Sequence, residues 1–125
     1  MSDLDALVTI ATAAGITRAY AVGNVPPTPG YPYAVLSCDT GTPGLRRAGG
    51  GSVRKDRRVT VQMFARTDDN VLALAALADV AFEDKVLSTL PRRPFSMREL
   101  QTGILRDPDT TGVLNILHTY KLLEA

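Results

Sequence analysis

The sequence is poor in the residues that most often build catalytic and redox sites. It has one cysteine, Cys38, one histidine, His118, and no tryptophan among 125 residues. A single cysteine excludes an intramolecular disulfide. The acidic start of the chain also lacks the basic-then-apolar order of a secretory signal peptide. We therefore expect a protein of a reducing compartment.

Long apolar runs and an excess of charge are missing as well. The longest nearly apolar stretch, residues 71–82, contains Asp79 and is well short of the roughly 20 residues that a membrane-spanning helix needs. Fourteen Lys and Arg against thirteen Asp and Glu give a net charge of +1, which is not the strongly basic balance of a dedicated nucleic-acid-binding protein. No membrane segment is expected, and any contact with phosphate must be local.

What the chain does contain is the composition of an ordinary globular protein. Hydrophobic residues make up 45% and charged residues 22% of the 125 positions. A chain of this length buries about two-thirds of its unfolded surface in one core. Residues 1–125 are therefore predicted to form a single domain.

The periodicity of apolar residues predicts two helices and five strands. Ser2 or Asp3 can cap a first helix that ends at Gly15, and Thr67, Asp68 or Asp69 can cap a second that runs to about residue 85. The expected strands cover residues 18–22, 33–39, 57–66, 96–106 and 113–123. The order α-β-β-β-α-β-β predicts an α+β fold in which two helices pack on a mainly antiparallel sheet.

The strand at 57–66 alternates two kinds of residue. Apolar residues at 59, 61, 63 and 65 would share one face, and Thr60, Gln62 and Phe64 the other. This pattern suits a sheet with both faces partly covered.

The second helix has more apolar surface than one sheet can cover. From residue 71 to 82 only Asp79 is polar, and a chain this short has no third layer to bury the far side. Val71, Ala75, Ala78 and Phe82 form the more continuous inward stripe. A second copy of the chain is the natural cover for the rest, so the predicted subunit interface contains Leu72, Ala76 and Leu77.

No motif for catalysis, cofactor binding or metal binding is present. The sequence lacks a nucleotide-binding P-loop, an HExxH zinc site, a CxxC pair, an EF-hand loop and a GxSxG elbow. His118 shares a strand face with apolar residues, which favours a hydrogen-bonded core histidine, and Cys38 is expected to pack. Asp68 with Asp69 suits a helix start, and Asp107 with Asp109 a turn. We expect no enzyme, no catalytic residue, no cofactor and no metal.

The positive signal is a basic segment in a long hairpin loop. Residues 40–56 contain five glycines and are expected to form a flexible loop between two strands. Six basic residues lie in and next to it: Arg46, Arg47, Arg54, Lys55, Arg57 and Arg58. They could contact an acidic protein surface or DNA phosphates. The alternative is a loop that charge merely keeps solvated.

Three segments resemble a known family when they are taken in order. They are PYAVLSCDTGTPGLRR at 32–47, RRVTVQMFARTDDNVLALAALAD at 57–79, and RELQTGILRDPDTTGVLNILHTYKL at 98–122. This arrangement resembles the tail terminator, or tail completion, proteins of long-tailed phages, especially those of actinobacterial hosts. The triple glycine at 49–51 and Cys38 carry no family role.

The resemblance implies a structural virion protein rather than an enzyme. Such a subunit forms a hexameric ring on the end of the tail tube, stops tube polymerisation and offers a surface to the head-side connector. Its partners would be itself, the tube protein and the connector, within a virion tail assembled in the host cytoplasm. Sequence-specific binding of nucleic acid is not implied, although packaged DNA could lie close by. The alternatives are another head-tail neck component, such as a stopper or adaptor, or a small DNA-binding module.

Overall fold

A computed structural model describes residues 3–39, 42–43, 55–90, 93–106, 108 and 111–123. The two helices and eight strands are α1 (Asp3–Ala13), β1 (Ala19–Ala21), β2 (Tyr33–Cys38), β3 (Thr42–Pro43), β4 (Lys55–Ala65), α2 (Asp68–Phe82), β5 (Lys85–Val86), β6 (Phe95–Gln101), β7 (Leu105–Arg106) and β8 (Leu114–Leu123). The predicted order of helices and longer strands is confirmed. The two-residue strands β3, β5 and β7 were not predicted from the sequence.

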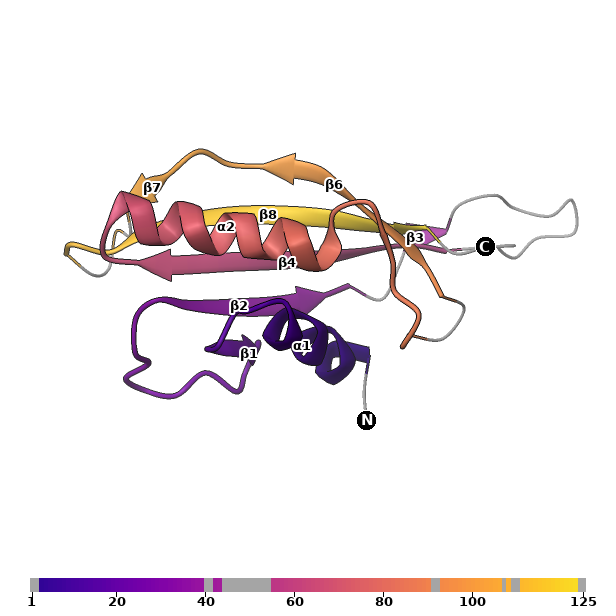
Figure 1. The fold of residues 1–125 in the computed structure, drawn as a ribbon, viewed down its shortest axis with the longest axis horizontal. Helices are drawn as coiled ribbons and strands as arrows, with labels where there is room; N and C mark the ends of the chain where they lie inside the picture. Colours follow the sequence, from indigo (N-terminus) through magenta and orange to yellow (C-terminus); the bar gives the residue numbers. More distant parts are fainter. Residues whose placement is uncertain are drawn as a thin grey trace, which may run out of the picture.

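The sheet is mixed, with one parallel pair at its edge. Its strand order is β1-β2-β4-β8-β6-β5, with β3 added beside β4 and β7 beside β8. Only β1 and β2 run parallel among these pairs. The long strands β4 and β8 lie side by side at the centre, as Figure 1 shows. The predicted mainly antiparallel α+β fold is therefore confirmed.

The helix ends follow from local backbone chemistry. Gly15 follows α1 with a φ of +119°, a left-handed conformation that costs glycine little. Thr67 caps α2, because its side-chain oxygen accepts a hydrogen bond of 3.2 Å from the backbone N–H of Asn70. The helix ends at Phe82 rather than near residue 85, since the backbone of Glu83 is extended.

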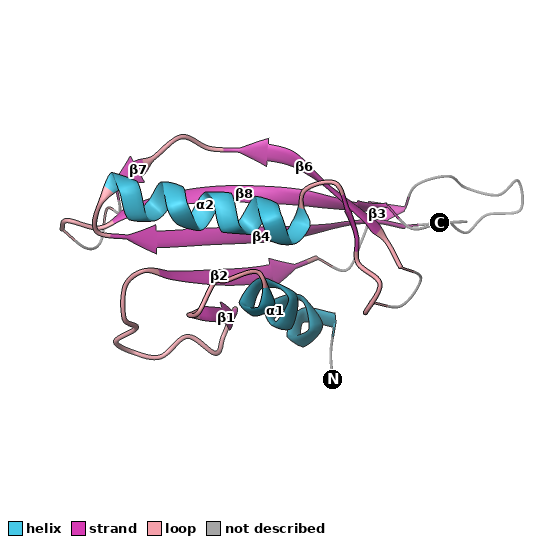
Figure 2. Ribbon diagram, in the orientation of Figure 1, coloured by secondary structure: helices cyan, strands magenta, loops and turns pink. Residues whose placement is uncertain are grey.

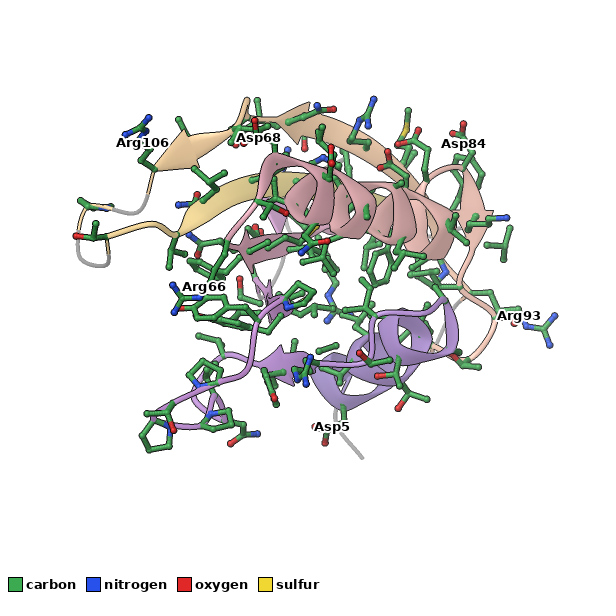
Figure 3. All side chains as sticks on the ribbon, turned by 60° about the vertical axis from the view of Figure 1, so that its left-hand side comes forward. Asp5, Arg66, Asp68, Asp84, Arg93 and Arg106 are labelled. Carbon is green, nitrogen blue, oxygen red and sulfur yellow. The ribbon has the colours of Figure 1, made fainter. Side chains whose placement is uncertain are left out.

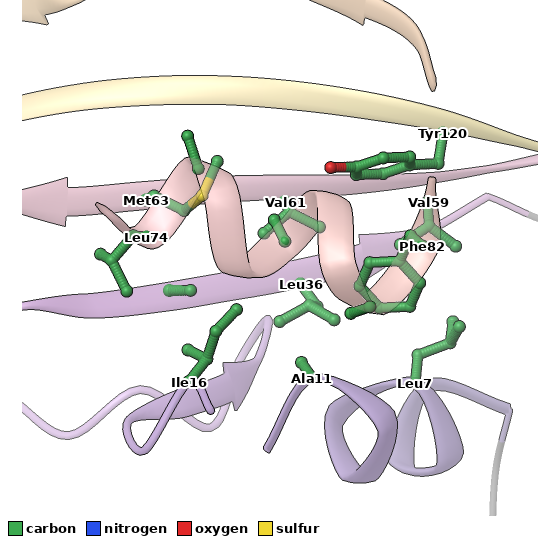
Figure 4. Packing of buried hydrophobic residues seen from close by; sticks show 14 of the residues in the cluster. Leu7, Ala11, Ile16, Leu36, Val59, Val61, Met63, Leu74, Phe82 and Tyr120 are labelled. Atoms are coloured by element: carbon green, nitrogen blue, oxygen red, sulfur yellow. The ribbon is translucent and has the colours of Figure 1, made fainter. Parts of the chain in front are cut away.

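Both helices pack on the same face of the sheet. On β4, Val59, Val61, Met63 and Ala65 are fully buried, and Leu36 on β2 continues this face. Figure 2 shows α1 beside β1 and β2, and α2 over β4 and β8. Side chains from both helices meet these strands in one core (Figure 4). In the described residues neither helix crosses to the other face, where Thr60, Gln62 and Phe64 of β4 are half-buried, as expected for a face that is partly covered.

The predicted strand at 96–106 is interrupted. It separates into β6 and β7, with Thr102, Gly103 and Ile104 between them. Thr102 keeps this segment on β8: its N–H donates to the Leu117 carbonyl at 3.0 Å, and its hydroxyl accepts from the Leu117 N–H at 3.0 Å. A register shift between Arg98 and Leu100 further bends β6.

The one charge inside the apolar part of α2 is used to bind the sheet. The hydroxyl of buried Tyr120 donates to Asp79 Oδ1 at 2.7 Å, and Arg98 Nη1 donates to Asp79 Oδ2 at 2.8 Å. His118 Nδ1 lies 2.9 Å from the same Tyr120 hydroxyl. His118 is 1% exposed, so the prediction of a hydrogen-bonded core histidine is confirmed.

Burial shifts the pKa values of His118 and Tyr120, both on β8. Removal from water lowers the pKa of His118, against the opposing attraction of Asp79, while the positive charge of Arg98 lowers it further. Burial also raises the pKa of Tyr120, and its hydrogen bond to Asp79 raises it again. The tyrosine therefore stays protonated and donates to Asp79. His118 is neutral at physiological pH.

The lowered pKa of His118 predicts that the folded protein is less stable in mild acid. An unfolded histidine titrates near about pH 6.5, so below that pH the unfolded chain binds a proton that the folded chain resists. The free energy of unfolding should fall by up to about 1 kcal/mol between about pH 7 and 5.5, and level off below the folded pKa. Urea denaturation at several pH values measures this dependence.

The variant His118→Gln isolates the effect, because it removes the only histidine. Its free energy of unfolding should be lower at neutral pH but nearly constant between about pH 7 and 5.5. An equal loss of stability in variant and parent over this range would contradict the assignment to His118.

Candidate assembly surfaces

The predicted basic loop is closed by strand pairing. Thr42 pairs with Asp56 and Pro43 with Lys55, so β3 and β4 form the base of a hairpin. Three of the six basic residues, Arg46, Arg47 and Arg54, lie outside the described residues, as does the side chain of Lys55. The loop role of these four residues stays a prediction.

The other two basic residues, Arg57 and Arg58, lie within β4 and contact their own chain. Arg58 binds both carboxylate oxygens of Glu99 on β6, at 2.7 and 3.2 Å, and its backbone N–H donates to Asp39 at 2.9 Å. Arg57 donates to the sulfur of Cys38 at 3.3 Å. These bonds connect three strands across the sheet. Both arginines therefore have partners within the fold, and their contact with another chain stays a prediction.

The outer side of α2 carries an apolar stripe. Leu72 and Val80 are 50% and 58% exposed, and exposed Ala76 lies midway between them at helical spacing. Leu77 differs, because it is partly buried and a methyl group built at Gly15 would lie 3.2 Å from it. The structure thus places Leu72 and Ala76 on the open surface and Leu77 against the end of α1. The subunit interface predicted from the sequence did not include Val80.

The sheet face opposite the helices has no covering layer among the described residues, and it carries an aromatic cluster. The rings of Tyr33 and Phe64 stack with centroids 4.8 Å apart. Tyr31 and Tyr20 lie 5.4 and 6.2 Å from Tyr33. These rings come from the connector and three different strands, so no sequence motif joins them. They give this face a rigid apolar region.

Further apolar side chains are exposed along the edge that contains β5, β6 and β7. They include Val86, Phe95, Met97, Leu100, Ile104 and Leu105. Together with the α2 stripe, this edge holds most of the large apolar side chains that the described residues expose. Such surfaces are typical of a protein that contacts other chains.

The described residues offer little for catalysis. They contain no group of three or more His, Cys, Asp and Glu that could hold a metal ion. His118 is enclosed under α2, and its Nε2 has no hydrogen-bond partner there. Within the part of the chain that is described, no helix is both long and apolar enough to cross a membrane. The absence of enzymatic activity stays an expectation.

Comparison with known proteins finds a likeness among solved structures. No family model and no curated protein matches the sequence. Among solved structures, the chain is similar to a chain of a structure described as the virion of a native gene transfer agent particle. That similarity has a TM-score of 0.73 at 16% sequence identity, and it covers 99% of this chain and 96% of the other. At this identity the likeness shows the fold: the whole α+β domain, helices and sheet together, is one that occurs in a virion particle.

Proposed function

We propose that this chain is a structural virion protein that caps a phage tail tube as a ring, ends tube polymerisation and forms the tail-side surface for head attachment. The observation that carries the proposal is the end-to-end fold similarity to a chain of a gene transfer agent virion, which covers 99% of this chain. The resemblance of the segments around β2, β4–α2 and β6–β8 to tail terminators supplies the specific role.

The surfaces of the domain suit such a role. A ring subunit contacts two neighbours through two different patches, and this domain has apolar residues exposed both on α2 and along β5–β7. The basic hairpin provides a further region for a partner in the particle. A neck component such as a stopper or adaptor would use the same features. The two functions are therefore distinguished by where the protein lies in the particle.

Electron microscopy of the purified protein with and without tail tubes tests the proposal. Rings at the ends of tubes, and a fixed tube length in their presence, are the expected result. Exclusive attachment to capsid portals would favour the neck alternative. A protein that stays monomeric when bound in the particle would overturn ring formation, whereas a monomer in free solution is compatible with it.

Placing a charge in the α2 stripe should block assembly. Ala76→Glu puts a carboxylate between Leu72 and Val80, so a neighbour that covers the stripe would have to bury an unpaired charge. Because Ala76 is exposed, the monomer should keep its fold. We expect a wild-type circular dichroism spectrum and the loss of tube-bound rings in electron micrographs.

Thr12→Glu is the matched control, because Thr12 is an exposed residue of α1 and the change adds the same charge. Its rings should form normally. Intact rings with Ala76→Glu would show that another face forms the subunit interface.

Reversing the charge of the hairpin should damage attachment more than folding. The variant replaces Arg46, Arg47, Arg54 and Lys55 with Glu. Its free energy of unfolding should differ from that of the parent by no more than about 0.5 kcal/mol per site. Charge complementarity governs encounter and register. If the partner is the tail tube, infected cells should produce tails of uncontrolled length. Normal tail length and infectivity would mean that the loop is only solvated.

A further inference from the structure

The exposed apolar residues of β6 and β7 lie on the sheet face that carries no helix, which we call the open face. Leu105 is opposite Asn115 on β8, and Asn115 is opposite Phe64 on β4. Opposite residues of neighbouring strands share a face, and Phe64 points away from the helices because the residues beside it on β4 are fully buried under them. The same register adds three exposed residues of β6 to this face: Phe95, Met97 and Leu100.

The other half of the open face is built from aromatic rings. They are the rings of Tyr20, Tyr31, Tyr33 and Phe64, which pack on one another. Gln62 continues β4 on this face, between Val35 on β2 and Leu117 on β8. These three side chains are half-buried, although no helix among the described residues covers them. The open face is therefore a broad and largely apolar surface without a second layer.

The α2 stripe lies on the other side of the same domain. Leu72, Ala76 and Val80 are exposed on the side of α2 that faces away from the sheet, and the sheet lies between them and the open face. Two surfaces on opposite sides of a domain cannot meet within one copy of the chain. They can meet between copies that are arranged head to tail, which is the geometry that closes into a ring.

The spacing of apolar groups on the two surfaces is similar. Leu72 and Val80 are separated by about 12 Å along the helix axis, since an α-helix rises about 1.5 Å per residue. On the open face, Leu105 and Leu100 lie opposite residues 115 and 119 of β8, which are about 13 Å apart along the strand. A helix that runs along the strands therefore places one apolar side chain near each of these leucines.

The ends of the α2 stripe are acidic. Asp68 and Asp69 are exposed in the first turn of α2, and its last turn has no basic residue. Exposed Asp84 follows the end of the helix. Figure 3 shows Asp68 and Asp84 near the two ends of α2. The stripe thus presents apolar side chains between negative charges.

The aromatic half of the open face carries the opposite charge. The guanidinium carbon of exposed Arg66 lies 4.6 Å from the centre of the Tyr31 ring. Exposed Arg18 lies against the same connector, because a methyl group built at Gly30 would be 2.9 Å from its Nε. Within the described ranges, neither arginine is in an ion pair with a carboxylate. An acidic helix and a basic sheet face attract each other and fix the register of a contact.

We propose that the α2 stripe of one copy of this chain packs on the open face of the next copy. The neighbour's helix supplies the second layer that this sheet face lacks. A contact between two open faces would leave the stripe of each copy uncovered and give its acidic ends no partner. The pairing rests on the proposed ring, to which it assigns the two contact surfaces.

Two variants with complementary defects test the pairing. Ala76→Glu places a charge in the stripe and keeps the open face, whereas Leu100→Glu places a charge on the open face and keeps the stripe. Both positions are exposed, so both monomers should keep the wild-type circular dichroism spectrum. Neither variant can join stripe to face with its own kind. A mixture can, because each variant supplies the surface that the other has lost.

Cysteine cross-linking detects this contact. Cys38→Ser removes the only native thiol. In that background the Leu100→Glu variant carries Ala73→Cys beside the stripe, and the Ala76→Glu variant carries Gln62→Cys in the middle of the open face. At high protein concentration, a short bismaleimide should link the two variants into a heterodimer. Its yield should be at least about tenfold above the dimer yield of either variant alone, because self-pairing buries an unpaired charge.

Thr12→Cys in place of Ala73→Cys is the control, because Thr12 is an exposed residue of the other helix. Equal cross-linking through the control, or none in the mixture, would overturn the pairing. Predominant linkage of two Gln62→Cys chains would also overturn it, since open faces would then pair with each other. If Leu100→Glu does not fold, Leu105→Glu takes its place, at a position of the open face that is 50% exposed.

The cross-link is measured without tail tubes, which separates it from the test of the proposed function. A heterodimer in the mixture supports the pairing even if micrographs show attachment to portals alone. Rings on tube ends without the heterodimer would reject this pairing and leave the capping function standing.

Discussion

The packing of α2 across β4 and β8 is the constraint on which the rest of the structure depends. The two longest strands would otherwise expose a continuous apolar face, and α2 covers it with Val71, Leu74, Ala78 and Phe82, each 5% exposed or less. Asp79 then joins this helix to β8 through Tyr120 and to β6 through Arg98. Removing the Asp79 carboxylate from water costs little free energy here, because each of its oxygens accepts a charge-assisted or buried hydrogen bond. The helix position is therefore fixed by specific bonds as well as by apolar contact.

A domain built on one covered sheet face leaves its other surfaces for partners. The aromatic cluster around Tyr33 and the edge from β5 to β7 have no second layer within the described residues. Exposed apolar surface of this kind is typical of sites that contact other chains. The fold also pairs arginines inside the sheet with carboxylates, Arg58 with Glu99 and Arg98 with Asp79.

The order of elements was predictable because apolar periodicity survives in a single sequence. Residues 59, 61, 63 and 65 alternate as a strand must, and the Thr67 cap marks the start of α2. The interruption of β6 and the two-residue strands could not be predicted, since they depend on pairing with β4, β6 and β8, which local periodicity does not show. Asp79 was visible as the one polar residue of an apolar helix, but its partners lie 19 and 41 residues away.

The size of the α2 stripe limits how the proposed ring could form. Fully burying a leucine or valine side chain contributes about 1.5–3 kcal/mol, and Leu72 and Val80 are already about half covered. Covering both would therefore contribute about 1.5–3 kcal/mol, less than the 4–15 kcal/mol that association costs in lost freedom of motion. A neighbour must also cover a second patch, or the subunits must be held together by a template that binds each of them. Under the proposed function a tube end would be that template, because it would fix the subunits side by side and turn each further contact into an intramolecular one. The modest apolar stripe thus fits a subunit that assembles on its target better than one that forms stable rings alone.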